Sequence, residues 1–179
     1  MKEFEKILLL SEKLRKGYKG SLEEVDVNYK SKWLEHFEIM PLFFEEIYSV
    51  CDGTKYDIQS QEFFDFLPGY RLMQIDEILD TYEKKFKDYD EDGIIIPFLA
   101  DYSGSYYMYA VIEGQESILL LVDGVLELIY SSTEKFWETI EAFYNENVYF
   151  LDEDGYLSYD YEKEGEIGRK YNSGIGYWE

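Results

Sequence analysis

The sequence predicts an α+β domain with a mostly antiparallel sheet of about five or six strands, packed by helices. The first observation is the continuous apolar run at residues 94–100, which is typical of a buried strand. The second is Asp123-Gly124 between the apolar segments 118–122 and 125–130, because this dipeptide favours the tight turn of a hairpin. The third is a stripe of aromatic and aliphatic residues at helical spacing within residues 136–144.

The N-terminal third predicts helices. Residues 1–16 carry apolar side chains at helical spacing, and Gly17 ends the pattern. A polar connection follows, and residues 29–37 predict a second, short helix. Pro41 suits the first turn of a third helix, which we expect to run toward Gly53.

The middle of the chain predicts strands around one helix. The aromatic run at residues 63–67 indicates a strand, and residues 71–73 begin the next element. Residues 75–86 predict an amphipathic helix with Asp76 near its start. Residues 106–111 follow the apolar run as the next strand.

The last third combines a helix with a polar tail. Ser131 and Glu134 have the spacing of a capping box, which predicts the start of the aromatic helix. Residues 148–151 and 156–161 then predict a pair of strands. After Tyr161 the chain is rich in glycine, so we expect irregular structure whose end packs back or frays.

Composition and charge limit the function. The 179 residues suit one domain, and the net charge is −22. Such a charge repels phosphate backbones and anionic membranes, so we expect neither nucleic-acid nor membrane binding. It suits a basic protein partner, although composition alone favours a purely solubilising surface.

The single cysteine, Cys51, permits no internal disulfide, and we expect it to be a buried core thiol. The sequence contains neither a signal-peptide pattern nor an apolar run long enough to span a membrane. We therefore expect a cytoplasmic protein, and no motif calls for a cofactor.

Calcium binding is one alternative. Asp88, Asp90, Asp92 and Gly93 match the opening of a calcium-binding loop, in which alternate oxygen ligands surround the ion. The match ends at Leu99, where a bidentate glutamate is required. An acidic loop between helix and strand explains the same residues.

Catalysis has weak support. Nucleophilic catalysis requires a base, and His36 is the only histidine. One histidine and one cysteine also fall short of the usual zinc ligand set. A hydrolase with paired carboxylates remains open, since 39 acidic residues make some pairing inevitable.

A protein-binding surface is the remaining candidate. Tyrosines supply contact area at low entropic cost, and carboxylates beside them pair with basic side chains. The alternative is a polar edge hairpin whose charges prevent aggregation. The candidate contact residues in the tail are Asp152, Glu153, Asp154, Tyr156, Tyr159, Asp160, Tyr161, Glu162 and Glu164.

The order of short motifs resembles the SUKH superfamily, which includes cell-wall-synthesis regulators and bacterial toxin-immunity proteins. The carrying segments are Met40-Pro41 with the helix after it, the step at residues 71–78, the strand and turn at residues 96–106, and the helix at residues 131–143. Met40 departs from the leucine that is usual there. The resemblance covers residues 29–145 and leaves residues 146–179 as an acidic, tyrosine-rich extension.

The resemblance implies a binding domain without catalytic residues, and it adds Asp101 and Tyr102 in the central turn as candidate contacts. We therefore expect an immunity-type protein that binds and neutralises a basic toxin, such as a nuclease. A regulatory adaptor for an endogenous protein is the alternative, and a carboxylate-dependent hydrolase is the third.

Overall fold

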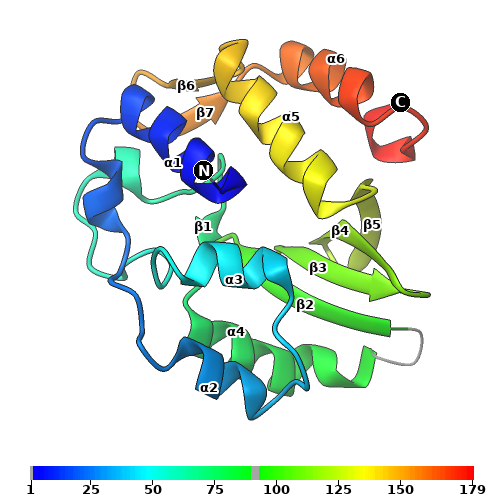
Figure 1. Ribbon diagram of the computed structural model, residues 1–179. Helices are drawn as coiled ribbons and strands as arrows, with labels where there is room; N and C mark the ends of the chain where they lie inside the picture. Colours follow the sequence, from blue (N-terminus) through cyan, green and yellow to red (C-terminus); the bar gives the residue numbers. More distant parts are fainter. Residues whose placement is uncertain (1, 90–92) are drawn as a thin grey trace.

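A five-stranded antiparallel sheet forms the centre of the fold (Figure 1). The computed structural model describes residues 2–89 and 93–179. Each strand pairs with the next along the chain, so the order is β1-β2-β3-β4-β5. This confirms the predicted α+β class with an antiparallel sheet. The strands are β1 (Arg71–Leu72), β2 (Gly93–Ala100), β3 (Tyr106–Ile112), β4 (Gln115–Val122) and β5 (Val125–Tyr130).

The turns and irregularities of the sheet follow from particular residues. Asp123 and Gly124 both have positive φ angles, 51° and 79°, as the two central residues of a primed hairpin turn require. Pro97 lies inside β2, where it has no N–H to donate, and the register shifts between Pro97 and Leu99. The bulge at Phe98 therefore accommodates a proline in a strand that has neighbours on both sides.

Helices cover both faces of the sheet. In Figure 1, α5 lies above the sheet and α4 lies below it, beside α2, whereas α3 crosses in front of the strands. The first turn of α1 is closed by the Glu5 carboxylate, which accepts a 3.0 Å hydrogen bond from the Lys2 main-chain N–H. The helices are α1 (Glu3–Leu14), α2 (Tyr29–Leu34), α3 (Leu42–Tyr48), α4 (Ile75–Thr81), α5 (Thr133–Asn145) and α6 (Tyr161–Tyr171). Shorter helical turns are η1 (Tyr18–Ser21), η2 (Gln61–Phe63), η3 (Tyr82–Phe86), η4 (Lys87–Tyr89) and η5 (Gly176–Trp178).

Aromatic rings fill the space between the sheet, α3 and α5. The ring of Phe43 lies 4.9 Å from that of Phe98 and 5.7 Å from that of Tyr109. Phe43 also contacts Phe136 and Trp137 on α5. On the opposite face, Phe86 packs edge-on against Tyr106. The apolar residues of β2 and β3 are therefore buried on both faces of the sheet by aromatic side chains from the helices.

Two predictions in the first half are corrected, and a third is refined. The segment 63–67 is not a strand, because only an isolated bridge joins Leu67 to Tyr70. The helix that follows Pro41 ends at Tyr48 and does not reach Gly53, although Cys51 is buried as expected. The helix predicted for residues 75–86 is confirmed in its extent, and it begins as α4 and finishes as the π-helical turn η3.

The start of α5 lies one residue later than predicted. Ser132 is the N-cap, and its hydroxyl accepts a hydrogen bond from the main-chain N–H of Lys135 at 3.1 Å. The capping box of Ser131 with Glu134 is therefore wrong.

The tail is more ordered than its glycines suggest. The predicted strand pair is confirmed as β6 (Tyr149–Leu151) and β7 (Leu157–Tyr159), which form a separate two-stranded sheet. The irregular segment predicted after Tyr161 is wrong, because α6 begins there with Asp160 as its N-cap. The indole of Trp178 packs back and donates a 2.7 Å hydrogen bond to the carbonyl oxygen of Ile129 on β5.

Candidate functional site

The turn after β2 is held by the Asp101 side chain. One carboxylate oxygen accepts hydrogen bonds from the N–H groups of Ser103, Gly104 and Ser105 at 2.7–2.8 Å. Burial acts against the charged form, but these bonds together with that from the Ser103 hydroxyl lower the pKa of Asp101. Asp101 therefore shapes the loop that presents Tyr102.

Tyr102 stands at the tip of this turn, where 69% of it is exposed. Its hydroxyl donates to the carboxylate of Asp65 at 3.2 Å. Burial, followed by the charge of Asp65, raises the pKa of Tyr102 to about 12, so the hydroxyl stays protonated. The other oxygen of Asp65 accepts from the N–H of Gly69 at 3.0 Å. A buried carboxylate thus orients an exposed ring.

Arg15 holds the loop that carries Asp65. This arginine is 1% exposed, and its Nη1 atom donates to the carbonyl oxygens of Glu62 and Asp65 at 2.9 and 2.6 Å. Its guanidinium lies 3.9 Å from the centre of the Tyr18 ring. This residue was not among the predicted site residues. The available signal was its place directly after α1, in register with the buried face of that helix, eleven residues after Phe4 and four after Ser11.

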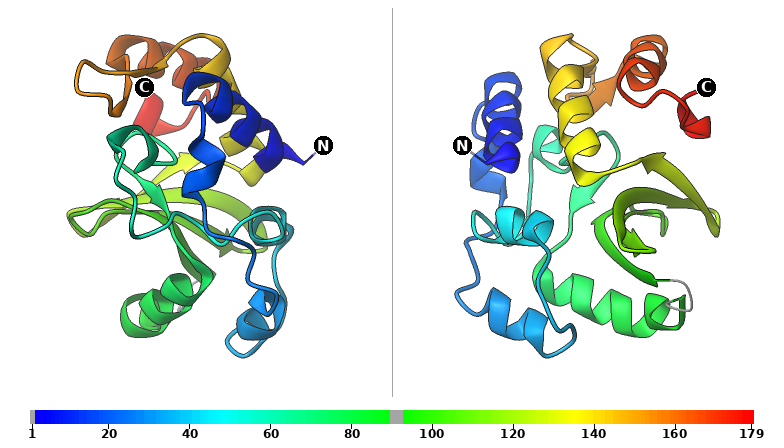
Figure 2. Two further views of the ribbon diagram at one scale, coloured as in Figure 1. Left: turned by 90° about the vertical axis from the view of Figure 1, so that its left-hand side faces the viewer. Right: turned by 45° about the vertical axis from the view of Figure 1, so that its right-hand side comes forward.

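The β6–β7 hairpin brings Tyr156 to the same side. The ring of Tyr156 lies 6.3 Å from that of Phe64, and its hydroxyl accepts a 3.3 Å hydrogen bond from Gln61. The Asp152 carboxylate closes the hairpin turn by accepting from the N–H groups of Asp154 and Tyr156. Glu153 and Asp154 are exposed at its tip. The left view of Figure 2 shows this orange hairpin on the same side as the teal segment 55–70.

A hollow of about 250 Å³ adjoins these rings. Tyr56, Arg71 and Tyr102 line it, together with Phe64. Arg71 makes a forked ion pair with Glu77, and the Tyr56 hydroxyl donates to the same carboxylate at 3.1 Å. Tyr56 is 66% exposed and was not among the predicted contacts.

The remaining predicted residues lie where β7 passes into α6. Tyr159 is 40% exposed at the end of β7, and Asp160 accepts a 3.1 Å hydrogen bond from the N–H of Lys163 as the N-cap. Tyr161 and Glu162 are exposed on the first turn, whereas Glu164 is half-buried. Exposed tyrosines from separate segments are neighbours here: Tyr56 and Tyr102 line one hollow, Tyr156 lies near Tyr102, and Tyr159 lies near both Tyr161 and Tyr177. This surface, the tyrosine face, comprises Tyr56, Tyr102, Tyr156, Tyr159, Tyr161 and Tyr177.

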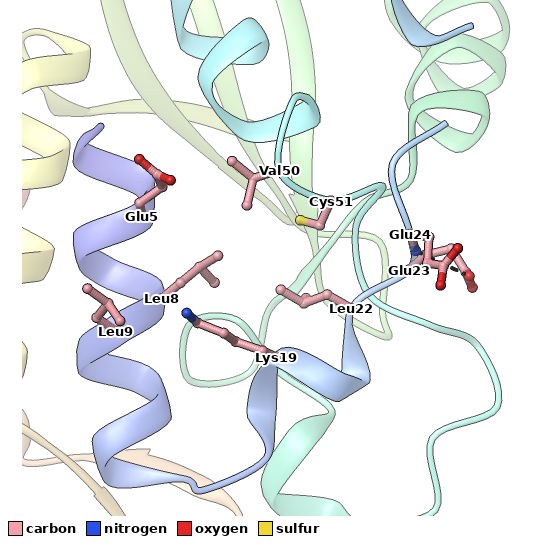
Figure 3. A pocket seen from close by; sticks show the side chains of 9 residues that line it. All are labelled: Glu5, Leu8, Leu9, Lys19, Leu22, Glu23, Glu24, Val50 and Cys51. Carbon is pink, nitrogen blue, oxygen red and sulfur yellow. Dashed lines mark hydrogen bonds between the residues drawn. The ribbon is translucent and has the colours of Figure 1, made fainter. Parts of the chain in front are cut away.

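A second hollow, of about 370 Å³, lies beside α1 (Figure 3). Leu8, Leu22 and Cys51 contribute its apolar lining, while Glu23 and Lys19 stand at its edge. Burial raises the pKa of the Cys51 thiol to about 12, so the thiol stays protonated and unreactive. The arrangement agrees with a structural role for the cysteine.

An acidic groove of about 440 Å³ lies between α1, α3 and α5. Its lining includes Glu134, Glu138 and Glu141, which share one side of α5 through their spacing. Lys6 also lines the groove and pairs with Glu3 at 2.8 Å. Nothing in the sequence distinguishes these residues, because acidic residues at helical spacing are typical of any solvated surface.

Metal and catalytic candidates find little support. Within residues 2–89 and 93–179, no group of three histidine, cysteine or acidic side chains is arranged to hold a metal ion. Asp88 is exposed in η4, and the other calcium candidates, Asp90 and Asp92, lie outside the described residues. His36 faces Glu83, with its Nδ1 atom 2.9 Å from the carboxylate, and Cys51 lines a different hollow.

Comparison with known proteins gives no assignment: no family model matches the chain, and neither does any curated protein. None of the helices in the described part of the chain is long and apolar enough to cross a membrane.

Proposed function

We propose that this chain is a non-enzymatic protein-binding domain that binds and neutralises a basic protein, in the manner of a toxin-immunity protein. The tyrosine face is the observation that carries the proposal. Exposed tyrosines contribute a large, fairly rigid contact area, and they are enriched where proteins bind one another.

Charge supports the choice of a basic partner. The net charge of −22 accelerates association with a positively charged protein and disfavours an acidic one. Several carboxylates border the tyrosine face, including Glu153, Asp154 and Glu162. A nuclease presents cations to phosphate groups, so an acidic surface is a suitable inhibitor of it.

The residues that hold the face in place also favour recognition. Tyr102 is oriented by buried Asp65, whose loop is fixed by buried Arg15. Pre-ordering of contact residues reduces the entropy lost on binding. The resemblance to the SUKH superfamily points in the same direction, since that family binds proteins.

Hydrolysis by paired carboxylates requires two carboxyl groups whose environments push their pKa values apart within one pocket. Burial raises the pKa of Glu46, Asp52, Asp65 and Glu164. These four groups belong to different parts of the fold, so binding is the function that the geometry supports best.

Co-purification from the native host tests the proposal. The wild-type chain, Tyr161→Ala on the tyrosine face and Tyr89→Ala on η4 serve as matched baits, because both tyrosines are more than half exposed. We expect a basic protein to be retained by the wild type and by Tyr89→Ala, and to be depleted with Tyr161→Ala. Co-expression should then suppress the activity of that protein. A partner that keeps its activity in the complex would favour the adaptor alternative.

A further inference from the structure

A hollow of about 450 Å³ opens between α6 and η5 at one end of the tyrosine face. Tyr161 and Tyr177 contribute aromatic walls, and Glu164 also lines the hollow. Tyr177 is 39% exposed and Tyr161 is 79% exposed, so the hollow is accessible from solvent.

Glu164 lacks a partner. No other group in the described part of the chain makes a hydrogen bond or ion pair with its carboxylate. Arg169 also lines the hollow, but its Nη1 atom donates to the carbonyl oxygen of Trp178 at 3.2 Å. Burial raises the pKa of Glu164 to about 7, as expected for a carboxyl group without a compensating cation.

Tyrosines on three strands lie close enough to interact electrostatically with this carboxylate. Burial first, and the charge of Glu164 among the further causes, raises the pKa of Tyr107 on β3, Tyr130 on β5 and Tyr149 on β6. Tyr130 and Tyr149 are 1% and 5% exposed, so these two tyrosines approach Glu164 from the core.

Further groups interact with Glu164 from the C-terminal segments. Besides the three tyrosines of β3, β5 and β6, Tyr159 on β7 and Tyr177 on η5 feel its charge. Glu162, Arg169 and Glu179 are the other charged residues of the hollow. The set combines one unpaired carboxylate, several hydroxyl oxygens and exposed aromatic rings.

We propose that this hollow, the Glu164 pocket, binds the guanidinium group of an arginine side chain. A guanidinium donates two parallel hydrogen bonds to a carboxylate, and its remaining N–H groups suit hydroxyl oxygens. Its planar cation also stacks on tyrosine rings more readily than the compact ammonium group of lysine. The inference rests on the proposed function for the source of the arginine, a basic protein, and names the group recognised at this end of the tyrosine face.

A small probe tests the pocket without the protein partner. N-acetyl-arginine methylamide is titrated into the full chain, and binding is followed by the NMR shifts of the Glu164 and Tyr177 resonances. We expect saturable binding that weakens roughly tenfold or more in Glu164→Gln, because a charge-assisted pair is lost. Glu166→Gln is the matched control, since this exposed residue on the same helix does not line the hollow. Binding should be tighter at pH 8 than at pH 6, because more of the Glu164 carboxyl group is ionised at the higher pH.

Equal affinity of Glu164→Gln and the wild type overturns the inference, as does absence of saturable binding at pH 8. Equal affinity for the corresponding lysine derivative overturns the choice of guanidinium. Different results would contradict the Glu164 pocket and the proposed function of the tyrosine face. If the probe does not bind while a basic protein partner remains sensitive to Tyr102→Ala, only the pocket is wrong. If the probe binds but basic protein partners are insensitive to Tyr102→Ala, the proposed contact surface is wrong.

Discussion

The Nη1 atom of Arg15 donates a 2.6 Å hydrogen bond to the main-chain carbonyl oxygen of Asp65, and this bond joins α1 to the loop beneath the tyrosine face. Asp65 in turn accepts a hydrogen bond from the Tyr102 hydroxyl through its side chain. Buried Arg15 therefore holds the loop of Asp65, and the buried Asp65 carboxylate orients the exposed ring of Tyr102.

Replacing this arginine should destabilise the fold. In Arg15→Met the buried charge disappears, but the carbonyl oxygens of Glu62 and Asp65 lose their donor. Because an unsatisfied buried acceptor costs more than a typical hydrogen bond contributes, we expect a loss of about 2–3 kcal/mol in urea unfolding. Lys16→Met removes a charge from the neighbouring exposed position as the control. Equal stability of the two variants would show that Arg15 is not needed to hold the loop.

Two glycines of α6 should respond to alanine in opposite directions. A Cβ atom at Gly168 would lie 2.0 Å from the indole of Trp178, whereas at Gly165 its nearest neighbour is Arg169 at 3.7 Å. We expect Gly168→Ala to cost about 1–3 kcal/mol through displacement of the indole. Gly165→Ala should gain about 0.5–1 kcal/mol from helix propensity. Urea denaturation measures both, and a gain in both variants would contradict the close packing of Trp178 on α6.

The Glu164 carboxyl group should make stability fall as pH rises. Its pKa is about 7 in the folded chain, above the ordinary glutamate value of 4.5, so the folded state holds the proton more tightly than the unfolded state. The protonated group therefore favours folding at low pH, and this contribution is lost between about pH 4.5 and pH 7. We expect the stability of Glu164→Gln relative to the wild type to rise across this window and then level off.

Urea unfolding at pH 5 and pH 8 checks this dependence, with Glu162→Gln removing the same charge from an exposed position on α6. If the two variants show the same change relative to the wild type between these pH values, burial of Glu164 has no energetic consequence.

Association with a basic partner should depend on salt. The net charge of −22 produces a long-range attraction that ions screen beyond about 8–10 Å at physiological salt. We expect the association rate constant to fall by about tenfold or more between low and high ionic strength, with a smaller change in the dissociation rate. Stopped-flow mixing measures both rates. An association rate constant that does not change with salt would contradict the claim that the net negative charge attracts the partner.

The sequence predicted those parts of the fold that depend on local pattern. Asp123-Gly124 marks its hairpin because both residues must adopt positive φ angles. Two adjacent serines precede α5, and local spacing alone does not decide between Ser131 and Ser132 as the cap. Gly168 favours a loop by propensity, but the packing of Trp178 from a later segment requires a glycine there within a helix.

The identities of many site residues could be predicted from the sequence, but their arrangement in space could not. The tyrosines and acidic residues of the tail were recognisable, and so was Tyr102 in the central turn. Their proximity depends on Phe64 and Gln61, which contact Tyr156 from a segment some ninety residues earlier in the chain. The role of Arg15 could not be predicted, because two of its hydrogen-bond acceptors are main-chain carbonyl oxygens. Every residue has such an oxygen, so the sequence does not show which of them Arg15 contacts.

The dissociation constant of the co-purified basic protein tests the central claim most directly. It is measured by calorimetry for the wild type, for the Tyr102→Ala and Tyr161→Ala double variant, and for Tyr89→Ala. The account predicts at least about thirtyfold weaker binding for the double variant, as expected when contact tyrosines are truncated, and no change for Tyr89→Ala. Equal affinity of all three chains would contradict the assignment of the tyrosine face as the binding surface.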